Sequence, residues 1–196
     1  MIELPGAPGA RSVTASFIDA GFTLNGAVGG PSTRVDRKGS RFRVEVTFPP
    51  MVKSDADLFV SRLIQAKEEG LRMPYPLLGV SQGMPGSPVV DGASPAGKTL
   101  PLRGLTTGYV FREGFWLSIE DAAGQHYLHN VTAPLKVTGT TANVPIIPAL
   151  RVPFADGATV HLAKPMVEGI IEGETQDWLI RVDHLFELRF AIKEAA

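Results

Sequence analysis

The sequence predicts a mainly β, α+β fold in which a discontinuous β-barrel or sandwich with one helix is interrupted by a small inserted antiparallel β-barrel. Strand-like alternation of apolar and polar residues occurs near both ends of the chain, and short apolar segments recur at regular spacing between them. The 196 residues include 21 glycines and 16 prolines, above average usage and spread along the chain, which is typical of many turns between short strands. With 44% apolar residues, the chain can bury a substantial core.

The first clear strand is the segment "RFRVEVTF", residues 41–48. Its apolar side chains share one parity and its polar side chains the other, which predicts one buried and one solvent-facing side. Pro49 and Pro50 end the strand because proline has no N–H to donate to a ladder. The apolar positions are Phe42, Val44, Val46 and Phe48.

One substantial helix is predicted over residues 54–70, "SDADLFVSRLIQAKEEG". Ser54 and Asp57 have the spacing of a capping box at its start. Gly70 is expected to end the helix because glycine readily adopts the left-handed conformation found after helix termini. The expected buried stripe consists of Leu58, Phe59, Leu63 and Ala66.

The middle of the chain differs in composition from both ends. Residues 73–97 contain five prolines and repeated glycines, which favours a loop or a crossing between domains. Beyond a boundary near Gly86, short apolar segments separated by glycine or proline predict a small antiparallel barrel that ends near Pro165.

The carboxyl end returns to strict alternation, and we expect one long strand there, interrupted at most by a bulge. Its pattern matches residues 41–48, which predicts that the two ends pair in one sheet. We therefore assign residues 1–86 and 166–196 to one β domain and residues 87–165 to an inserted barrel. The positions on the apolar parity are Ile180, Val182, His184, Phe186, Leu188, Phe190 and Ile192.

Charge and composition exclude several classes of protein. The 19 basic and 20 acidic side chains nearly cancel, so no long-range field attracts nucleic acid or an anionic membrane. The basic segment at residues 33–41 has no interleaved aromatics for base stacking and is interpreted as a solvated loop, or a rim that contacts an acidic partner. No secretory signal or membrane-spanning run is visible, so a soluble protein made in the cytoplasm is expected. Cysteine is absent, which excludes disulfides and thiolate metal sites.

The segment "EDAAGQHYLHNVTA", residues 120–133, raises the question of a metal site because His126 and His129 lie close to two acids. The flanking apolar segments and the intervening turn predict a β-hairpin. On a strand, an odd separation sends two side chains to opposite faces, so these histidines are not expected to chelate one ion. Zinc needs three or four converging ligands, and no third is marked by the sequence. We predict no metal site.

The other candidate residues do not form a catalytic group. His161 and His184 are isolated, and His184 lies on the apolar parity, where a core or interface position is expected. The glycine-rich segments near the amino terminus lack the spacing of phosphate-binding loops. Glu120 and Asp121 flank a turn, and a glycosidase pair would have to come from distant segments. We therefore expect no catalytic residue, no cofactor and no enzymatic activity.

The middle of the chain resembles the distal tail proteins of long-tailed bacteriophages. The resemblance rests on "LPLRGL", "GYVFREGFWLSI", "GQHYLHNVTA" and "IIPALRVPFADGATVHLAKP". The terminal segments "RFRVEVTFPPM", "AKEEG" and "LRFAIKEAA" also fit the split arrangement of that family, in which a ring-forming β domain is interrupted by an oligosaccharide-binding-like barrel. These motifs are short and structural, and the family carries no catalytic residues to transfer.

The resemblance implies a structural virion protein located at the phage tail tip and assembled in the host cytoplasm. It would form a ring, expected to be a homo-hexamer, that joins the tail tube protein to the baseplate hub or other tail-tip proteins. Another ring protein of the same tail, such as a tube-terminating subunit, remains open. Arginines on the polar parity of the strands are expected to contribute to the oligomer interface, namely Arg41, Arg43, Arg181 and Arg189.

The alternative from another class is a monomeric carbohydrate-binding or hydrolytic β-protein. Aromatic side chains in the barrel could stack on sugars, but most are expected to be in the core because they lie on alternating strands. These residues are Tyr109, Phe111, Phe115, Trp116 and Tyr127.

Overall fold

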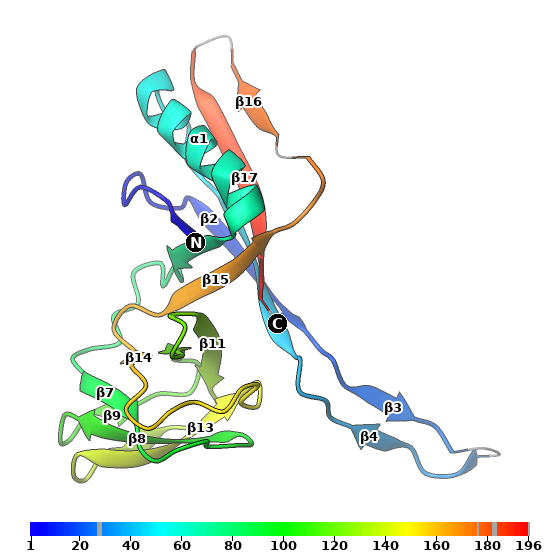
Figure 1. Cartoon of the computed structure of the whole chain (residues 1–196), viewed down its shortest axis with the longest axis vertical. Helices are drawn as coiled ribbons and strands as arrows, with labels where there is room; N and C mark the ends of the chain where they lie inside the picture. Colours follow the sequence, from blue (N-terminus) through cyan, green and yellow to red (C-terminus); the bar gives the residue numbers. More distant parts are fainter. Residues whose placement is uncertain (27–28, 176, 182–183, 196) are drawn as a thin grey trace.

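The computed structural model describes residues 1–26, 29–175, 177–181 and 184–195. The fold is mainly β, with 43% strand, 9% helix and a single helix in the described chain, as the sequence predicted. A sheet built from both ends of the chain lies under the helix, a barrel-like sheet from the middle lies beside it, and a hairpin projects away from both (Figure 1). No described helix has the length and apolar character needed to span a membrane.

We call the sheet formed by the two ends the split sheet. Its main path has the order β1-β6-β15-β17-β5-β2, and β16 pairs with β17 off this path. Its elements are β1 (Ile2–Glu3), β2 (Ser12–Ile18), β5 (Arg41–Thr47), β6 (Leu71–Pro74), β15 (Met166–Ile171), β16 (Trp178–Ile180) and β17 (Phe186–Glu194), and it is covered by α1 (Lys53–Glu69).

We call the six-stranded sheet of the middle segment the barrel. Its order is β14-β10-β11-β13-β8-β7, and a bridge between Val89 and Thr159 brings its two edges together. Its strands are β7 (Gly86–Val90), β8 (Thr99–Leu105), β10 (Trp116–Glu120), β11 (His126–Val131), β13 (Thr141–Ile147) and β14 (Val160–His161), with the small pair β9 (Val110–Phe111) and β12 (Leu135–Lys136) alongside.

The pairing of the two ends of the chain is confirmed. β17 runs antiparallel to β5, with Phe190 opposite Val46 and Ile192 opposite Val44. The apolar parity of both strands is buried against α1, in a cluster that also includes Phe59 and Leu63. The barrel has a separate buried cluster, although Leu128 of β11 belongs to the core of the split sheet.

The helix is confirmed, but two details of its prediction were wrong. It begins after Val52 without a side-chain cap, so Ser54 lies inside the first turn and forms no capping box. Leu58 is 47% exposed, and Ala56 takes its place on the buried face, because positions 56, 59, 63 and 66 follow the helical repeat more closely. Gly70 ends the helix with a positive φ of 81°.

The single long strand predicted at the carboxyl end was wrong. The chain forms a hairpin in which β16 pairs with β17 and Ile180 lies opposite Phe186. His184 adopts a positive φ of 62° and its N–H donates to the carbonyl of Arg181, at 3.0 Å, which closes the turn. His184 is exposed, so it does not lie in the core of the chain, and the interface position that was the other expectation stays a prediction. Val182 lies outside the described residues.

Polar contacts fix the barrel against the split sheet. The buried Glu194 carboxylate accepts hydrogen bonds from the N–H groups of Phe42 in β5, at 2.8 Å, and Leu128 in β11, at 2.7 Å. Arg151 forms a salt bridge with the same carboxylate, at 2.6 Å. Trp116 of β10 adds a ring contact with Phe42, at 4.9 Å between centroids.

Truncation of Phe190 tests the core of the split sheet. This side chain is 4% exposed and stacks on Phe48, and a buried Phe to Ala change costs about 3–5 kcal/mol. We expect Phe190→Ala to lower the free energy of unfolding by that amount in urea titration. Hydrogen exchange should show lost protection in residues 41–48 and 186–194. As a control, Ile170→Ala, at a 60% exposed site of the same sheet, should change stability by less than about 0.5 kcal/mol.

The predicted domain boundaries are tested by expressing residues 87–165 alone. Because the strands of this segment close around their own buried cluster, we expect a fragment that resists proteolysis and unfolds cooperatively. Circular dichroism during heating measures this directly. A protease-sensitive fragment without a cooperative transition would contradict the division.

Candidate functional site

A projecting hairpin is the most prominent surface feature of the molecule. β3 (Phe22–Leu24) and β4 (Thr33–Val35) pair with each other alone among the described strands and extend β2 and β5 beyond the split sheet (Figure 1). We call residues 19–26 and 29–40 the arm. Its apolar side chains Phe22 and Leu24 are 38% and 53% exposed, since the arm has no core of its own.

The base of the arm is held by a chain of ion pairs. Arg34 contacts Asp19 at 2.6 Å and Asp36 at 2.8 Å, and Lys98 of the barrel contacts Asp36 at 3.1 Å. Hydrogen bonding to Arg34 lowers the pKa of both carboxyls. Each pair is exposed and individually weak, and the pair of Lys98 and Asp36 connects the arm to the barrel.

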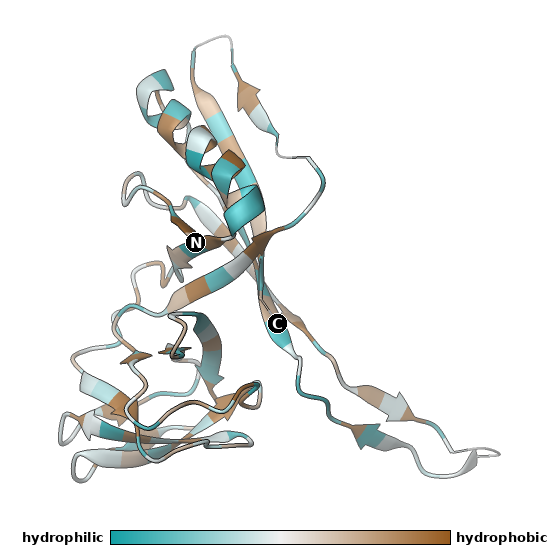
Figure 2. Cartoon of the chain, in the orientation of Figure 1, coloured by the Kyte–Doolittle hydropathy of each residue, from teal (hydrophilic) through white to brown (hydrophobic). Residues whose placement is uncertain are grey.

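A second exposed apolar surface lies at the opposite end of the split sheet. Trp178, Leu179 and Ile180 of β16 are 40%, 57% and 60% exposed, and the strand is visible as an apolar segment in Figure 2. Between β16 and α1 lies a groove of about 440 Å³. Its lining combines the apolar side chains of Val60, Trp178, Ile180 and Phe186 with the polar side chains of Lys53, Asp57 and His184.

The four predicted interface arginines do not form one patch. Arg43 and Arg189 meet at Glu45, on the face of the split sheet opposite the helix, and hydrogen bonds from both arginines lower the pKa of the Glu45 carboxyl. Arg181 instead pairs with Glu187, at 2.9 Å, in the β16–β17 hairpin. Arg41 lies at the start of β5, and its Nε is buried without a hydrogen-bond partner.

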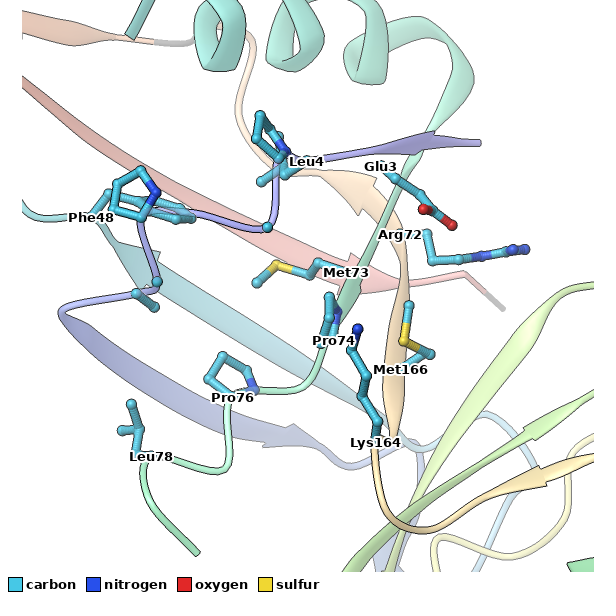
Figure 3. Close-up of a pocket in the computed structure, with 15 residues that line it drawn as sticks. Glu3, Leu4, Phe48, Arg72, Met73, Pro74, Pro76, Leu78, Lys164 and Met166 are labelled. Carbon is cyan, nitrogen blue, oxygen red and sulfur yellow. The ribbon is translucent and has the colours of Figure 1, made fainter. Parts of the chain in front are cut away.

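A pocket with a mainly apolar lining lies on the split sheet, beside the amino-terminal segment. It measures about 510 Å³ and lies between the amino-terminal segment, β6 and the loop that leads to the barrel. Figure 3 shows Glu3 and Arg72 at one end and Phe48 and Leu78 at the other. Its charged lining residues are Glu3, Arg72 and Lys164, and its described lining has no histidine, serine or tyrosine.

The hairpin predicted over "EDAAGQHYLHNVTA" is confirmed, with β10 and β11 paired in regular register. Its two histidines have different neighbours, as their spacing predicted. His129 is fully buried, with its Nδ1 3.0 Å from the carbonyl oxygen of Pro148. The His126 ring lies against His161, at 4.9 Å between centroids. Burial lowers the pKa of His129 to about 3 and that of His126 to about 4, so both rings are neutral at pH 7.

The structure brings two further ligand-type side chains to His126 that the sequence analysis did not mark. Glu120 is its direct partner across the hairpin, and His161 approaches from β14, with its Nε2 3.1 Å from Glu120 Oε2. The predicted hairpin could have indicated Glu120 as a neighbour of His126, because residues that pair across a turn lie on the same face of the sheet. The contribution of His161 depends on a contact over 41 residues, which the local sequence does not specify.

The barrel aromatics form no exposed stacking platform, which agrees with their predicted core positions. Phe111 and Tyr127 are buried, and Tyr109 and Phe115 pack against the same core. Trp116 packs between Phe42 and Tyr75 at the junction with the split sheet.

Comparison with known proteins identifies no family. The sequence matches no protein-family model, and a search among curated proteins gives no significant match.

The buried histidines predict sensitivity to acid. A histidine whose pKa is lowered on folding binds its proton more readily in the unfolded chain, so stability falls as the pH drops below about 6.5. With a folded pKa of about 3, His129 should cost about 2 kcal/mol at pH 5 relative to pH 7. We expect His129→Gln to remove that share of the pH dependence in urea titrations at the two pH values.

Tyr127→Phe is the matched control, because it changes the same strand without removing a group that titrates in this range. It should keep the full difference between pH 5 and pH 7. Equal acid sensitivity in His129→Gln and the wild type would show that this ring does not control the effect.

Proposed function

We propose that the protein is a structural subunit of a bacteriophage tail, a distal tail protein. It forms an oligomeric ring at the distal end of the tail tube and joins the tube to the tail tip or baseplate. Its partners are further copies of itself, the tail tube protein and the baseplate hub or other tail-tip proteins, so its location is the virion. It has no enzymatic role.

The open edge formed by β2 and the arm is the observation that carries this proposal. β2 ends the path of the split sheet and pairs with β5 alone among the described strands. Its sequence, "SVTASFI", has no charge and no proline, whereas edge strands of monomeric proteins are usually protected by one of these. The arm continues this edge, and an isolated two-stranded hairpin is only marginally stable in water. Both features fit a surface that is covered on assembly.

The apolar surface at β16 supplies a complement for the arm. The two surfaces lie at opposite ends of the split sheet, so they cannot cover each other within one chain. We infer that the arm of one copy covers β16 and the groove beside α1 in the next copy. Such a head-to-tail contact generates a closed ring when the rotation between neighbours closes.

The carbohydrate alternative has less support. The five aromatics that could stack on sugars pack within the barrel or at its junction. The short motifs that resemble distal tail proteins, together with the split arrangement of the fold, favour the ring.

The ring is tested by native mass spectrometry of the purified protein. We expect a closed assembly of about six copies of the 20.9 kDa chain. The double variant Phe22→Ser, Leu24→Ser should shift the protein to monomers, because each buried side chain of this size contributes about 2 kcal/mol to an interface. Val110→Ser is the control, since it removes a 45% exposed apolar side chain from the barrel and should leave the ring intact.

Three outcomes would contradict the proposal in different ways. A wild-type monomer that binds glycans would favour the carbohydrate alternative. A ring that persists in the arm variant would show that the arm does not form the interface. Electron microscopy of an intact phage particle with the subunit labelled gives its position, and a location away from the tail tip would exclude a distal tail protein.

A further inference from the structure

Three side chains with metal-ligating atoms converge at one edge of the barrel. They are Glu120 at the end of β10, His126 at the start of β11 and His161 in β14. One ligand atom from each lies within 4.8 Å of the others. None of the three belongs to the arm, β16 or the arginine clusters.

The strand register explains why they share one face. Glu120 is directly opposite His126, and His161 is opposite Ser118, two residues before Glu120. Because alternate residues of a strand face the same side and cross-strand partners face it together, all three side chains extend from the same side of three neighbouring strands. The strand register therefore places all three side chains on one face at this edge of the barrel.

The buried state of His126 is the second observation that indicates a ligand. Its side chain is among the buried polar groups, at 5% exposure, and its Nδ1 has no hydrogen-bond partner in the described structure. A buried ring nitrogen without a partner is costly and requires an explanation, of which an absent ion is one. The ring lies against that of His161, whose Nε2 also reaches Glu120.

We propose that Glu120, His126 and His161 bind a divalent first-row transition metal, with Zn²⁺ as the ion that fits this ligand set. Two histidines and one carboxylate are a recurrent zinc ligand set, and tetrahedral coordination needs ligand atoms about 3.4 Å apart. His161 and Glu120 are about one-third exposed, so modest rotations of these side chains close the remaining distance. Three protein ligands leave a fourth position for water.

Charges of both signs surround the site. Asp121 adds a second carboxylate next to Glu120, where the chain turns, and carboxylates offset part of the desolvation of a divalent ion. Arg72 is the positive charge that acts on His126, and it is paired with Glu168, at 2.6 Å, and with the carbonyl of Gly124.

The metal would stabilise the edge of the barrel from which the chain continues into the split sheet. β14 contains only two residues, and the chain passes from it through residues 162–165 into β15. An ion shared by β10, β11 and β14 would fix this short strand to the hairpin. This role is independent of ring formation.

The site is tested with untagged, full-length protein that has been treated with EDTA and dialysed. Zn²⁺ alone is then titrated by isothermal calorimetry at pH 7.5, and bound metal is counted by plasma mass spectrometry after desalting. We expect one equivalent per chain and a rise in the midpoint of thermal unfolding, because a ligand that binds the folded state stabilises it.

Glu120→Gln and His161→Gln change partly exposed ligands, so both variants should fold, and each should lower zinc affinity by at least about tenfold. His129→Gln is the matched control, because it removes a histidine from the same strand on the other face and should keep wild-type affinity. The proposal is overturned if the wild type binds no stoichiometric zinc. It is also overturned if the two ligand variants bind as tightly as the wild type and the control.

Discussion

The buried carboxylate of Glu194 determines how the two parts of the molecule meet. It accepts hydrogen bonds from the N–H groups of Phe42 and Leu128 and pairs with Arg151. One side chain therefore contacts a strand of the split sheet, a strand of the barrel and an arginine in a loop. Burial raises the pKa of the Glu194 carboxyl, whereas Arg151 and the two backbone donors act in the opposite direction. Because each member would be costly to leave unpaired, the barrel cannot move away from the split sheet without loss of the whole network.

The local alternation of apolar and polar residues predicted the strands whose burial follows that alternation. The alternation in β5 and β17 predicted both their buried faces and their pairing, since matching apolar parities have to share one core. Glu194 lies on the buried parity of β17, two residues beyond Ile192, and an acid at such a position indicates a buried partner. Its partners are 152, 66 and 43 residues away, so the sequence does not identify them. The turn at His184 was missed because no glycine or asparagine marks its left-handed conformation.

The surfaces were less predictable than the core. The sequence predicted an interface from the arginines of the polar parity, but the structure gives Arg43, Arg189 and Arg181 acidic partners within the chain. The larger unpartnered surface is apolar and lies on the arm and β16. Short strands such as β3 and β4 carry a weak periodic signal, and whether they face a core or solvent depends on tertiary structure rather than on their residues. The convergence of His161 with the β10–β11 hairpin has the same long-range origin.

This chain combines a firmly packed interior with an edge strand, β2, that has no protecting charge or proline. The Glu194 network and the contacts of Trp116 fix the barrel to the split sheet, and the ion pairs of Arg34 and Lys98 lie at the base of the arm. The conformational entropy of the barrel and the split sheet is therefore lost on folding, before any partner binds. An edge strand without charge or proline, such as β2, is a liability in a monomer because it promotes aggregation. Such an edge on a rigid sheet lowers the entropic cost of association, which is why it fits the ring that we propose.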